Sequence, residues 1–451
     1  MRLALGIGVA LGFVTFLKVW FCSECILPNY NPTSSNRLIA SISWTGVFFF
    51  LFFFSFATVR PLSYMLLPLL IVLWAKGWFY QKVRADYREV LTRSLTLWAF
   101  VALGLLVFLH TWGSTGEVEW IRKHLEKYAR FFYGAMIIMM LYNRPDWQRF
   151  ALLGFVAAML FTLASTWLNI WFLLPWSKSQ NLGWGVSHHV FRDYIIQNLM
   201  MSLFVAIAIC RLHQAYFIHQ KILWSVIMMA SIISITHLSQ GRTGIVALFS
   251  VLLMIFMLKS RKFFVFGAIA LCATLLVVLK TSESLGPGLY LAVTEFQSYA
   301  TLMDPSTSIG HRLFNYQTTL ALSAESPWIG HGTGAYHTEI CRFVEPRYDC
   351  HPYNVHPHNQ FLFMAADHGL IGILFYLGFI FSIFATGLST QNKNYQILLF
   401  SIGAILVIDS LFNSSLWIAA HAMFFIFMIS LLSVLPLNEM PRKKTSEGGK
   451  L

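Results

Sequence analysis

Long apolar runs recur along almost the whole chain, and they restrict its fold more than any other feature. A helix needs about 20 apolar residues to cross the hydrocarbon core of a bilayer. Because lipid offers the backbone no hydrogen-bond partner, a chain of this kind crosses it as helices. We therefore predict an all-α, polytopic membrane protein with about 12 transmembrane helices. The predicted spans are residues 3–21, 41–58, 62–80, 94–112, 128–142, 150–171, 194–210, 222–237, 244–258, 263–280, 361–385, 396–412 and 416–435.

The charge of the chain favours membrane insertion over binding to nucleic acid. Charged residues make up 11% of the chain, against about a quarter in soluble proteins. The formal net charge is +13, but the basic residues cluster between apolar runs, as in cytoplasmic loops. We therefore expect membrane lipids as partners and no nucleic acid. The main clusters are Lys82, Arg84, Arg88 and Arg93; Lys259, Arg261 and Lys262; and Arg442, Lys443 and Lys444.

The chain divides into four parts. Residues 1–280 hold about ten apolar runs, 281–360 form one large loop, 361–437 hold the C-terminal spans, and 438–451 form a basic tail. If the tail is cytoplasmic, three crossings place the 281–360 loop outside, where its many aromatic residues predict short helices over the mouth of the bundle. The first run is too long for a signal-peptide core, so we expect it to be retained. Continuing the count places the N-terminus outside despite Arg2, so one of the first three runs is a half-span or an interfacial helix.

The cysteines divide into two pairs of interest. Cys341 and Cys350 share the 281–360 loop, where an oxidising compartment allows a disulfide. A disulfide and two free thiols are equally compatible with the sequence. Cys22 and Cys25 form a C-x-x-C motif without a surrounding βαβ pattern, so we predict no redox function for them.

Two arginines stand at the outer side of the predicted bundle. Arg242 lies in residues 239–244, a very short connection between two spans. An arginine at this boundary needs a partner or reaches the lipid headgroups by snorkelling, which is the commoner behaviour of a single boundary arginine. Arg312 lies in the 281–360 loop and shares a helical face with Tyr316, one turn further on.

Three more elements lie between Arg312 and the end of the last spans. Residues 326–334 are rich in glycine, but no strand precedes them, so we expect tight turns that hold a helix rather than a dinucleotide site. Pro357 suits the start of a helix, which puts His358 in its first turn, facing the outer cavity. Asp409 lies within an apolar run, and a carboxylate inside a span is a functional hypothesis by default.

These elements, in this order, resemble the O-antigen ligase and polymerase superfamily of bacterial membrane glycosyltransferases. The resemblance covers about residues 194–435, and residues 187–194, which include Arg192, further resemble the ligase branch. Each motif alone is weak, but their order and their spacing between spans make a strong joint signal. The motifs are Ser239-x-x-Arg242, Arg312 at the head of a helix, Pro327-x-x-Gly330-x-Gly332, His358-Asn359 and Asp409.

The resemblance implies transfer of a glycan from undecaprenyl diphosphate on the periplasmic face of the bacterial inner membrane. The ligase branch implies lipid A–core as the acceptor, in lipopolysaccharide biosynthesis. A guanidinium binds phosphate through a planar fork and stays charged, so we expect Arg242 and Arg312 to stabilise the leaving diphosphate without a metal or cofactor. His358 would be the general base of one inverting displacement. Further substrate contacts are expected from Arg192, Tyr316, Asn359, Gln360 and Asp409.

Three functional interpretations compete. An O-antigen polymerase or a protein O-oligosaccharyltransferase would share the donor and the chemistry, so only the acceptor separates them from a ligase; residues 187–194 favour the ligase by analogy. A transporter without chemistry would place polar residues at mid-membrane in helices broken by Gly or Pro. Here the polar residues gather at one face and in one loop, which disfavours a transporter.

Overall fold

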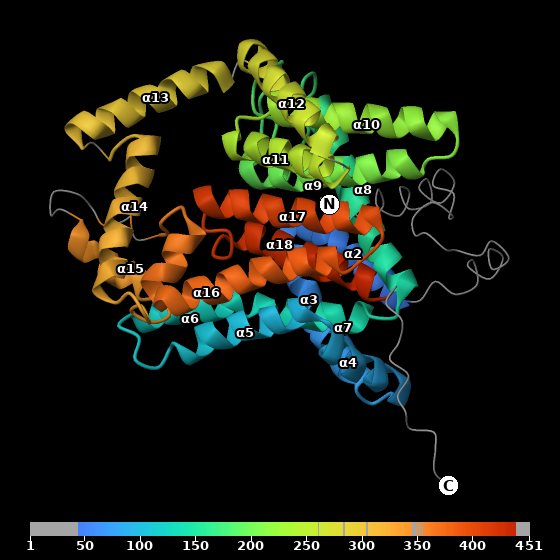
Figure 1. Ribbon diagram of the computed structural model, residues 1–451, viewed down its shortest axis with the longest axis horizontal. Helices are drawn as coiled ribbons and strands as arrows, with labels where there is room; N and C mark the ends of the chain where they lie inside the picture. Colours follow the sequence, from blue (N-terminus) through green and yellow to red (C-terminus); the bar gives the residue numbers. More distant parts are fainter. Residues whose placement is uncertain are drawn as a thin grey trace, which may run out of the picture.

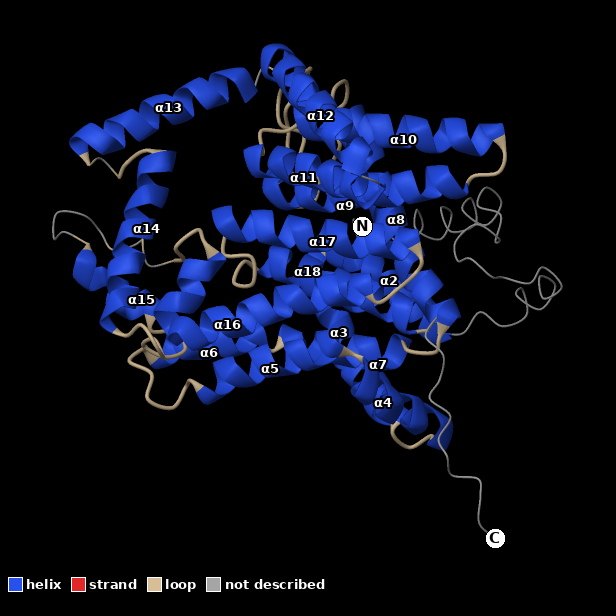
Figure 2. Cartoon of the chain, in the orientation of Figure 1, coloured by secondary structure: helices blue, strands red, loops and turns tan. Residues whose placement is uncertain are grey.

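The computed structural model describes residues 44–438, except for 260, 283–284, 304, 345–349, 351–352 and 354. Over these residues the all-α prediction is confirmed, because every regular element is a helix and no strand is present (Figure 2). The helices are α2 (Trp44–Ala57), α3 (Arg60–Gly77), α4 (Gln81–Arg93), α5 (Leu95–Leu109), α6 (Val118–Tyr128), α7 (Arg130–Leu141), α8 (Pro145–Leu168), α9 (Tyr194–Gln214), α10 (Ile218–His237), α11 (Arg242–Lys259), α12 (Arg261–Thr281), α13 (Leu285–Leu302), α14 (Ser308–Glu325), α15 (Tyr336–Glu339), the 3₁₀ helix η3 (Ile340–Phe343), α16 (Gln360–Leu388), α17 (Lys393–Phe412) and α18 (Ala419–Leu437).

Each predicted span that falls within the described residues coincides with a helix. Eight of these helices are long and apolar enough to cross a membrane, and a ninth span results if the bent pair α3 and α4 counts as one. Helices α2 and α5 are apolar but have only 14 and 15 residues. The chain is thus a multi-pass membrane protein, and the count of about 12 spans stays a prediction. The first predicted span, residues 3–21, lies outside the described residues, as do Cys22 and Cys25.

Helices α18 and α9 form the centre of the bundle. In α18, 94% of the spanning residues are buried, and in α9, 89%. The sequence of α18 is apolar on all sides apart from single small polar residues, and a helix that is hydrophobic all round is buried. It packs against α7, α17 and α2 among others, and Figure 1 shows it enclosed by these neighbours. In contrast, only 11% of the α12 span is buried, as expected at the edge of a bundle.

Two long helices make up almost half of the 281–360 loop. Helices α13 and α14 have 18 residues each, whereas α15 and η3 have four each. Figure 1 shows α13, α14 and α15 together at one end of the bundle. The Tyr299 hydroxyl of α13 donates to Gln317 at 2.6 Å, and Glu295 accepts the Ile309 N–H at 2.9 Å. Helices α13 and α14 are therefore longer than predicted, and these hydrogen bonds join them to each other.

The glycine-rich loop after α14 packs against a break in α16. At Gly369 the backbone of α16 leaves helical geometry, with φ 60° and ψ −154°. The N–H of Leu370 then donates to the Pro327 carbonyl at 2.8 Å instead of to its own helix. A Cβ at Gly330 would lie within 2.5 Å of the Asp367 backbone, so the close approach requires glycine. The prediction of tight turns that hold a helix is confirmed.

Candidate functional site

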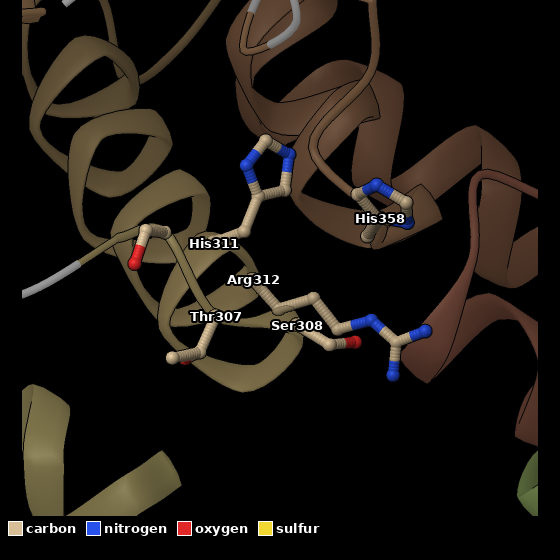
Figure 3. A pocket seen from close by; sticks show the side chains of 6 residues that line it. Thr307, Ser308, His311, Arg312 and His358 are labelled. Carbon is tan, nitrogen blue, oxygen red and sulfur yellow. The ribbon is translucent and has the colours of Figure 1, made fainter.

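A pocket of about 270 Å³ lies where α14 begins, beside the segment that leads into α16 (Figure 3). Thr307 is the N-cap of α14, and its hydroxyl accepts the Gly310 N–H at 3.0 Å. A threonine in this position satisfies one of the free N–H groups of a helix start. The cap thereby places His311 and Arg312 in the first turns of α14. The pocket is lined by Ser306, Thr307, Ser308, His311, Arg312 and His358.

His358 reaches this pocket from a turn, not from a helix. The prediction that it lies in the first helical turn is wrong, because α16 begins at Gln360 with Asn359 as its N-cap. The Asn359 side chain accepts two N–H groups of the first turn, at 2.9 and 3.1 Å. His358 itself has a φ of 56°, a left-handed conformation that costs about 1–3 kcal/mol outside glycine. Its N–H donates to His356 Nδ1 at 3.2 Å, which helps to hold that conformation.

The His358 ring lies in a buried and positively charged environment. Its centroid is 5.7 Å from that of His311 and 4.2 Å from that of His356. Its Nδ1 atom is buried and has no hydrogen-bond partner among the residues that the structure describes. Burial lowers the pKa of His358 to about 3, and Arg312 and His311 add to this lowering. The unliganded ring is therefore neutral at physiological pH.

Arg312 and Tyr316 lie one turn apart on α14, as predicted, and both reach the His358 turn. Figure 3 shows the Arg312 side chain extending from α14 below the His358 ring. Within the described part of the chain, no hydrogen bond or ion pair neutralises this guanidinium. The Tyr316 hydroxyl donates to the carbonyls of His358, at 3.1 Å, and of Leu411, at 2.8 Å. Tyr316 therefore joins α14 to the His358 turn and to the end of α17.

Arg242 does not line the pocket. It is the first residue of α11, and its guanidinium lies against α13, because a Cβ built on Gly288 would be 3.1 Å from Arg242 Nε. Glu295, further along α13, holds the start of α14. About 10 Å of helix separates these two contact points of α13. Helix α13 thus contacts Arg242 near its own start. Through Glu295 it also contacts the beginning of α14, the helix that carries Arg312.

Asn359 and Gln360 have contacts within the protein that compete with the predicted sugar contacts. The Asn359 amide donates to the Leu411 carbonyl at 3.3 Å while its oxygen caps α16. Gln360 is fully buried, donates to the Tyr128 hydroxyl at 3.3 Å and accepts the Leu416 N–H at 2.9 Å. Gln360 is thus buried away from solvent, and each end of its amide already has a partner within the protein.

Asp409 and Arg192 are also held by other parts of the protein. The Asp409 carboxylate lies 2.7 Å from Nδ1 of His421 and accepts the Asn413 amide at 2.8 Å. Arg192 is buried and donates to the Phe56 carbonyl at the end of α2. Neither side chain lines the pocket described above. The sequence signal for Asp409 did not include His421, because the partner lies on another helix.

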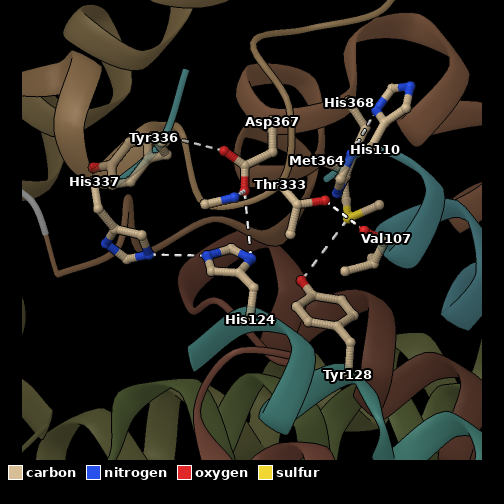
Figure 4. Close-up of polar contacts among 12 residues, drawn as sticks. Val107, His110, His124, Tyr128, Thr333, Tyr336, His337, Met364, Asp367 and His368 are labelled. Atoms are coloured by element: carbon tan, nitrogen blue, oxygen red, sulfur yellow. Dashed lines mark hydrogen bonds and ion pairs between the residues drawn. The ribbon is translucent and has the colours of Figure 1, made fainter. Parts of the chain in front are cut away.

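A second group of polar side chains surrounds the break in α16 (Figure 4). His124 Nδ1 lies 3.5 Å from Asp367, and its Nε2 lies 3.0 Å from Nε2 of His337. His110 and His368 approach each other at 3.0 Å. No group of three or more His, Cys, Asp or Glu side chains within the described residues is arranged to hold a metal ion. The sequence analysis did not identify this cluster, because its members come from four separate segments.

A disulfide joins Cys341 to Cys350, with the Cα atoms 5.4 Å apart. The sequence left this pairing open. The bridge closes the segment that follows η3 and precedes the His358 turn. Such bonds persist in oxidising compartments.

A comparison with known protein families gives a match to one part of the chain. Residues 225–377 match the protein-family model Wzy_C, described as O-Antigen ligase. This stretch begins in α10 and ends in α16, so it contains Arg242, Arg312 and His358. No curated protein matches the chain. Over this third of the chain, the multi-pass membrane protein is therefore similar to the Wzy_C O-antigen ligase family, whose enzymes transfer lipid-linked glycans.

Proposed function

We propose that this protein is an O-antigen ligase of the bacterial inner membrane. It transfers the O-antigen polysaccharide from undecaprenyl diphosphate to the lipid A–core oligosaccharide. The pocket formed by Arg312, His311 and His358 carries this proposal, because it lies inside the matched family region. Among the described residues Arg312 has no counter-ion, and such an arginine beside a neutral histidine suits a site that receives a diphosphate and removes a proton.

Arg312 binds the leaving diphosphate in this proposal. A guanidinium donates to phosphate oxygens through a planar fork and needs no metal to do so. The hydroxyl group of Ser308 lines the same pocket and offers a further donor. Arg242 approaches from the α13 side and adds a second positive charge at the same end of the bundle.

His358 acts as the general base in a single displacement. The acceptor hydroxyl oxygen bonds to the anomeric carbon while the bond from that carbon to the diphosphate oxygen breaks. The bonding electrons leave with undecaprenyl diphosphate, and the hydroxyl proton passes to His358. Attack from the face opposite to the leaving group inverts the anomeric configuration.

His358 can act as the base only when the donor is bound, because the pKa of its ring is low in the free enzyme. A base with a pKa of about 3 is a weak proton acceptor near neutral pH. A bound diphosphate brings negative charge next to Arg312 and offsets the positive charge that lowers the pKa. Donor binding therefore raises the pKa of His358 and activates the base only in the complex.

Two observations support the proposed orientation of the site. The basic tail and the cluster in α4 favour a cytoplasmic location for the opposite end of the bundle. The disulfide between Cys341 and Cys350 favours an oxidising compartment for the pocket end. Both support a periplasmic active site.

The identity of the acceptor is tested by deleting the gene that encodes this protein and separating the lipopolysaccharide of the cells on a gel. A ligase deletion leaves an intact core and removes the whole ladder of O-antigen bands. A core that carries a single repeat unit would instead identify a polymerase. An unchanged ladder would direct attention to a protein acceptor, as in the oligosaccharyltransferases.

The proposed metal-free chemistry has its own test. Purified protein treated with EDTA should keep its transfer rate, because arginines supply the positive charge. Strong inhibition that a divalent cation reverses would show that a metal ion takes part.

A further inference from the structure

Helix α4 presents a basic surface at the end of the bundle opposite to the pocket. The N–H of Asn143, beside α4, donates to the Asn438 side chain at the C-terminal end of α18 at 3.1 Å. The other end of α18 follows the Asp409–Asn413 region, which contacts the His358 turn. With 19 residues, α18 spans about 28 Å, close to the thickness of a bilayer core. The pocket and α4 therefore lie near opposite membrane surfaces.

The chain turns sharply between α3 and α4. The two helices are bent by 103° relative to each other, so α4 cannot continue the path of α3 across the membrane. Trp78 in the turn packs on Tyr87 with ring centroids 5.5 Å apart, and a Cβ on Gly77 would collide with the Tyr87 hydroxyl. This packing holds the bend. Figure 1 shows α4 extending away from the bundle below α7.

Both acidic residues of α4 are neutralised by ion pairs. Asp86 is buried and lies 2.7 Å from Arg144 Nη1, at the turn between α7 and α8. Glu89 pairs with Arg93 at 3.3 Å. The negative charges of α4 are therefore unavailable to balance its remaining basic side chains.

The remaining basic side chains of α4 are exposed. Lys82, Arg84 and Arg88 have no ion-pair or hydrogen-bond partner within the residues that the structure describes. Just before them, Phe79 and Tyr80 are 87% and 55% exposed, and aromatic rings of this kind favour the membrane–water interface. Exposed rings followed by three unpaired cations match the pattern of a helix that lies on an anionic membrane surface.

We propose that α4 is an interfacial helix that binds the phosphate groups of anionic phospholipids through Lys82, Arg84 and Arg88. Phe79 and Tyr80 enter the headgroup region, and the ion pair of Asp86 with Arg144 fixes the helix to the bundle. This role is independent of glycan transfer. It anchors the bundle on the side of the membrane away from the pocket.

Helix α6 offers a matched control on the same chain. It is also short and charged, but Lys123 pairs with Glu119 at 2.6 Å and Arg122 with Glu126 at 3.8 Å. Arg122 and Lys123 therefore have acidic partners, whereas Lys82, Arg84 and Arg88 of α4 have none among the described residues. Removing charge from α6 should have little effect on the binding of anionic lipid.

The test uses the full-length protein in phosphatidylcholine vesicles that contain spin-labelled phosphatidylglycerol or spin-labelled phosphatidylcholine. Electron paramagnetic resonance measures the fraction of each labelled lipid that the protein immobilises. The K82Q/R84Q/R88Q variant should lose preference for phosphatidylglycerol by about fivefold or more, since each basic residue near an anionic surface contributes about that factor. The charge-conserving K82R/R84K/R88K variant and the R122Q/K123Q variant should keep the preference.

High salt should weaken the preference of the wild-type protein, because screening acts on exposed charges. An unchanged preference in the K82Q/R84Q/R88Q variant overturns the proposal. An equal loss in the R122Q/K123Q variant also overturns it, since the effect would then follow net charge alone. Thermal unfolding of each variant separates a loss of lipid binding from a loss of folding.

Discussion

The pocket at α14 and the Asp409–His421 pair are both built from ionisable side chains, but they differ in how those side chains are satisfied. Asp409 has a partner on each carboxylate oxygen, His421 and Asn413, at 2.7 and 2.8 Å. In the pocket, His358 Nδ1 has no hydrogen-bond partner among the described residues, and Arg312 has no counter-ion there. Burying an unpaired polar group costs about 1–3 kcal/mol of stability. A ligand that forms hydrogen bonds with His358 or Arg312 would remove this cost.

From this difference we infer that the Asp409–His421 pair is structural, whereas the pocket at α14 binds a ligand. A buried polar pair that is complete within the protein holds helices together, here α17 and α18. Ionisable side chains that lack partners and lie next to a cavity are typical of a ligand-binding site. The predictions below test this distinction, beginning with the largest expected change in transfer rate.

Replacing His358 should have the largest effect. His358→Ala removes the proposed base, and a general base contributes about a hundred- to ten-thousandfold in rate. Turnover should fall by that order while binding of the lipid-linked donor is largely kept, because arginine holds the diphosphate. Single-turnover kinetics and donor binding on the purified variant measure the two quantities. Loss of donor binding in place of turnover would give His358 a different role.

Replacing the arginines by lysine keeps the charge but removes the planar fork. Arg312→Lys and Arg242→Lys should each lower kcat/KM for the donor by about a hundredfold. Arg342→Lys is the control, because Arg342 lies in the same loop and is paired on the surface with Glu325 and Glu339, both at 2.7 Å. Its activity should stay close to wild type. Near-normal rates in both test variants would instead support snorkelling arginines.

The pH dependence of kcat and of kcat/KM should reflect the unusual pKa of His358. The base is active when neutral, so activity is lost as the pH falls through its pKa. In the free enzyme this pKa is about 3, chiefly because the ring is buried. The profile of kcat/KM should therefore stay flat well below pH 6, whereas the profile of kcat should decline at a higher pH, because bound diphosphate raises the pKa. An acid limb of kcat/KM near the ordinary histidine value contradicts this account.

Changes in the buried pair should affect stability more than rate. His421→Ala leaves the Asp409 carboxylate without its 2.7 Å partner and should lower the free energy of unfolding by about 1–3 kcal/mol. The folded fraction should transfer glycan at nearly the wild-type rate. Thermal unfolding in detergent, together with turnover per folded molecule, provides the measurement. A collapse of turnover in well-folded protein would instead support the predicted contact of Asp409 with the substrate.

The positions of the helices could be predicted from the sequence because the length of an apolar run is a local property. Each predicted span within residues 44–438 coincides with a helix, and the turns at Gly330 and Gly332 followed from the local demand for glycine. The start of α16 was misplaced by three residues, since the helix begins at Gln360 and not at Pro357. Pro357 and Asn359 are both good helix starters, and only the hydrogen bonds of Asn359 show which of them is used.

The membrane-spanning helices, the glycine turns and the family-like order of Arg242, Arg312 and His358 can be read from the amino-acid sequence alone. Which of these polar groups meet depends on how the helices pack. This packing brought His311 to His358 and His421 to Asp409, and it left Arg242 against α13 outside the pocket. The physical reason is that hydrophobic length and capping act between neighbours in the chain. Burial and pairing of charges instead depend on which helices pack together.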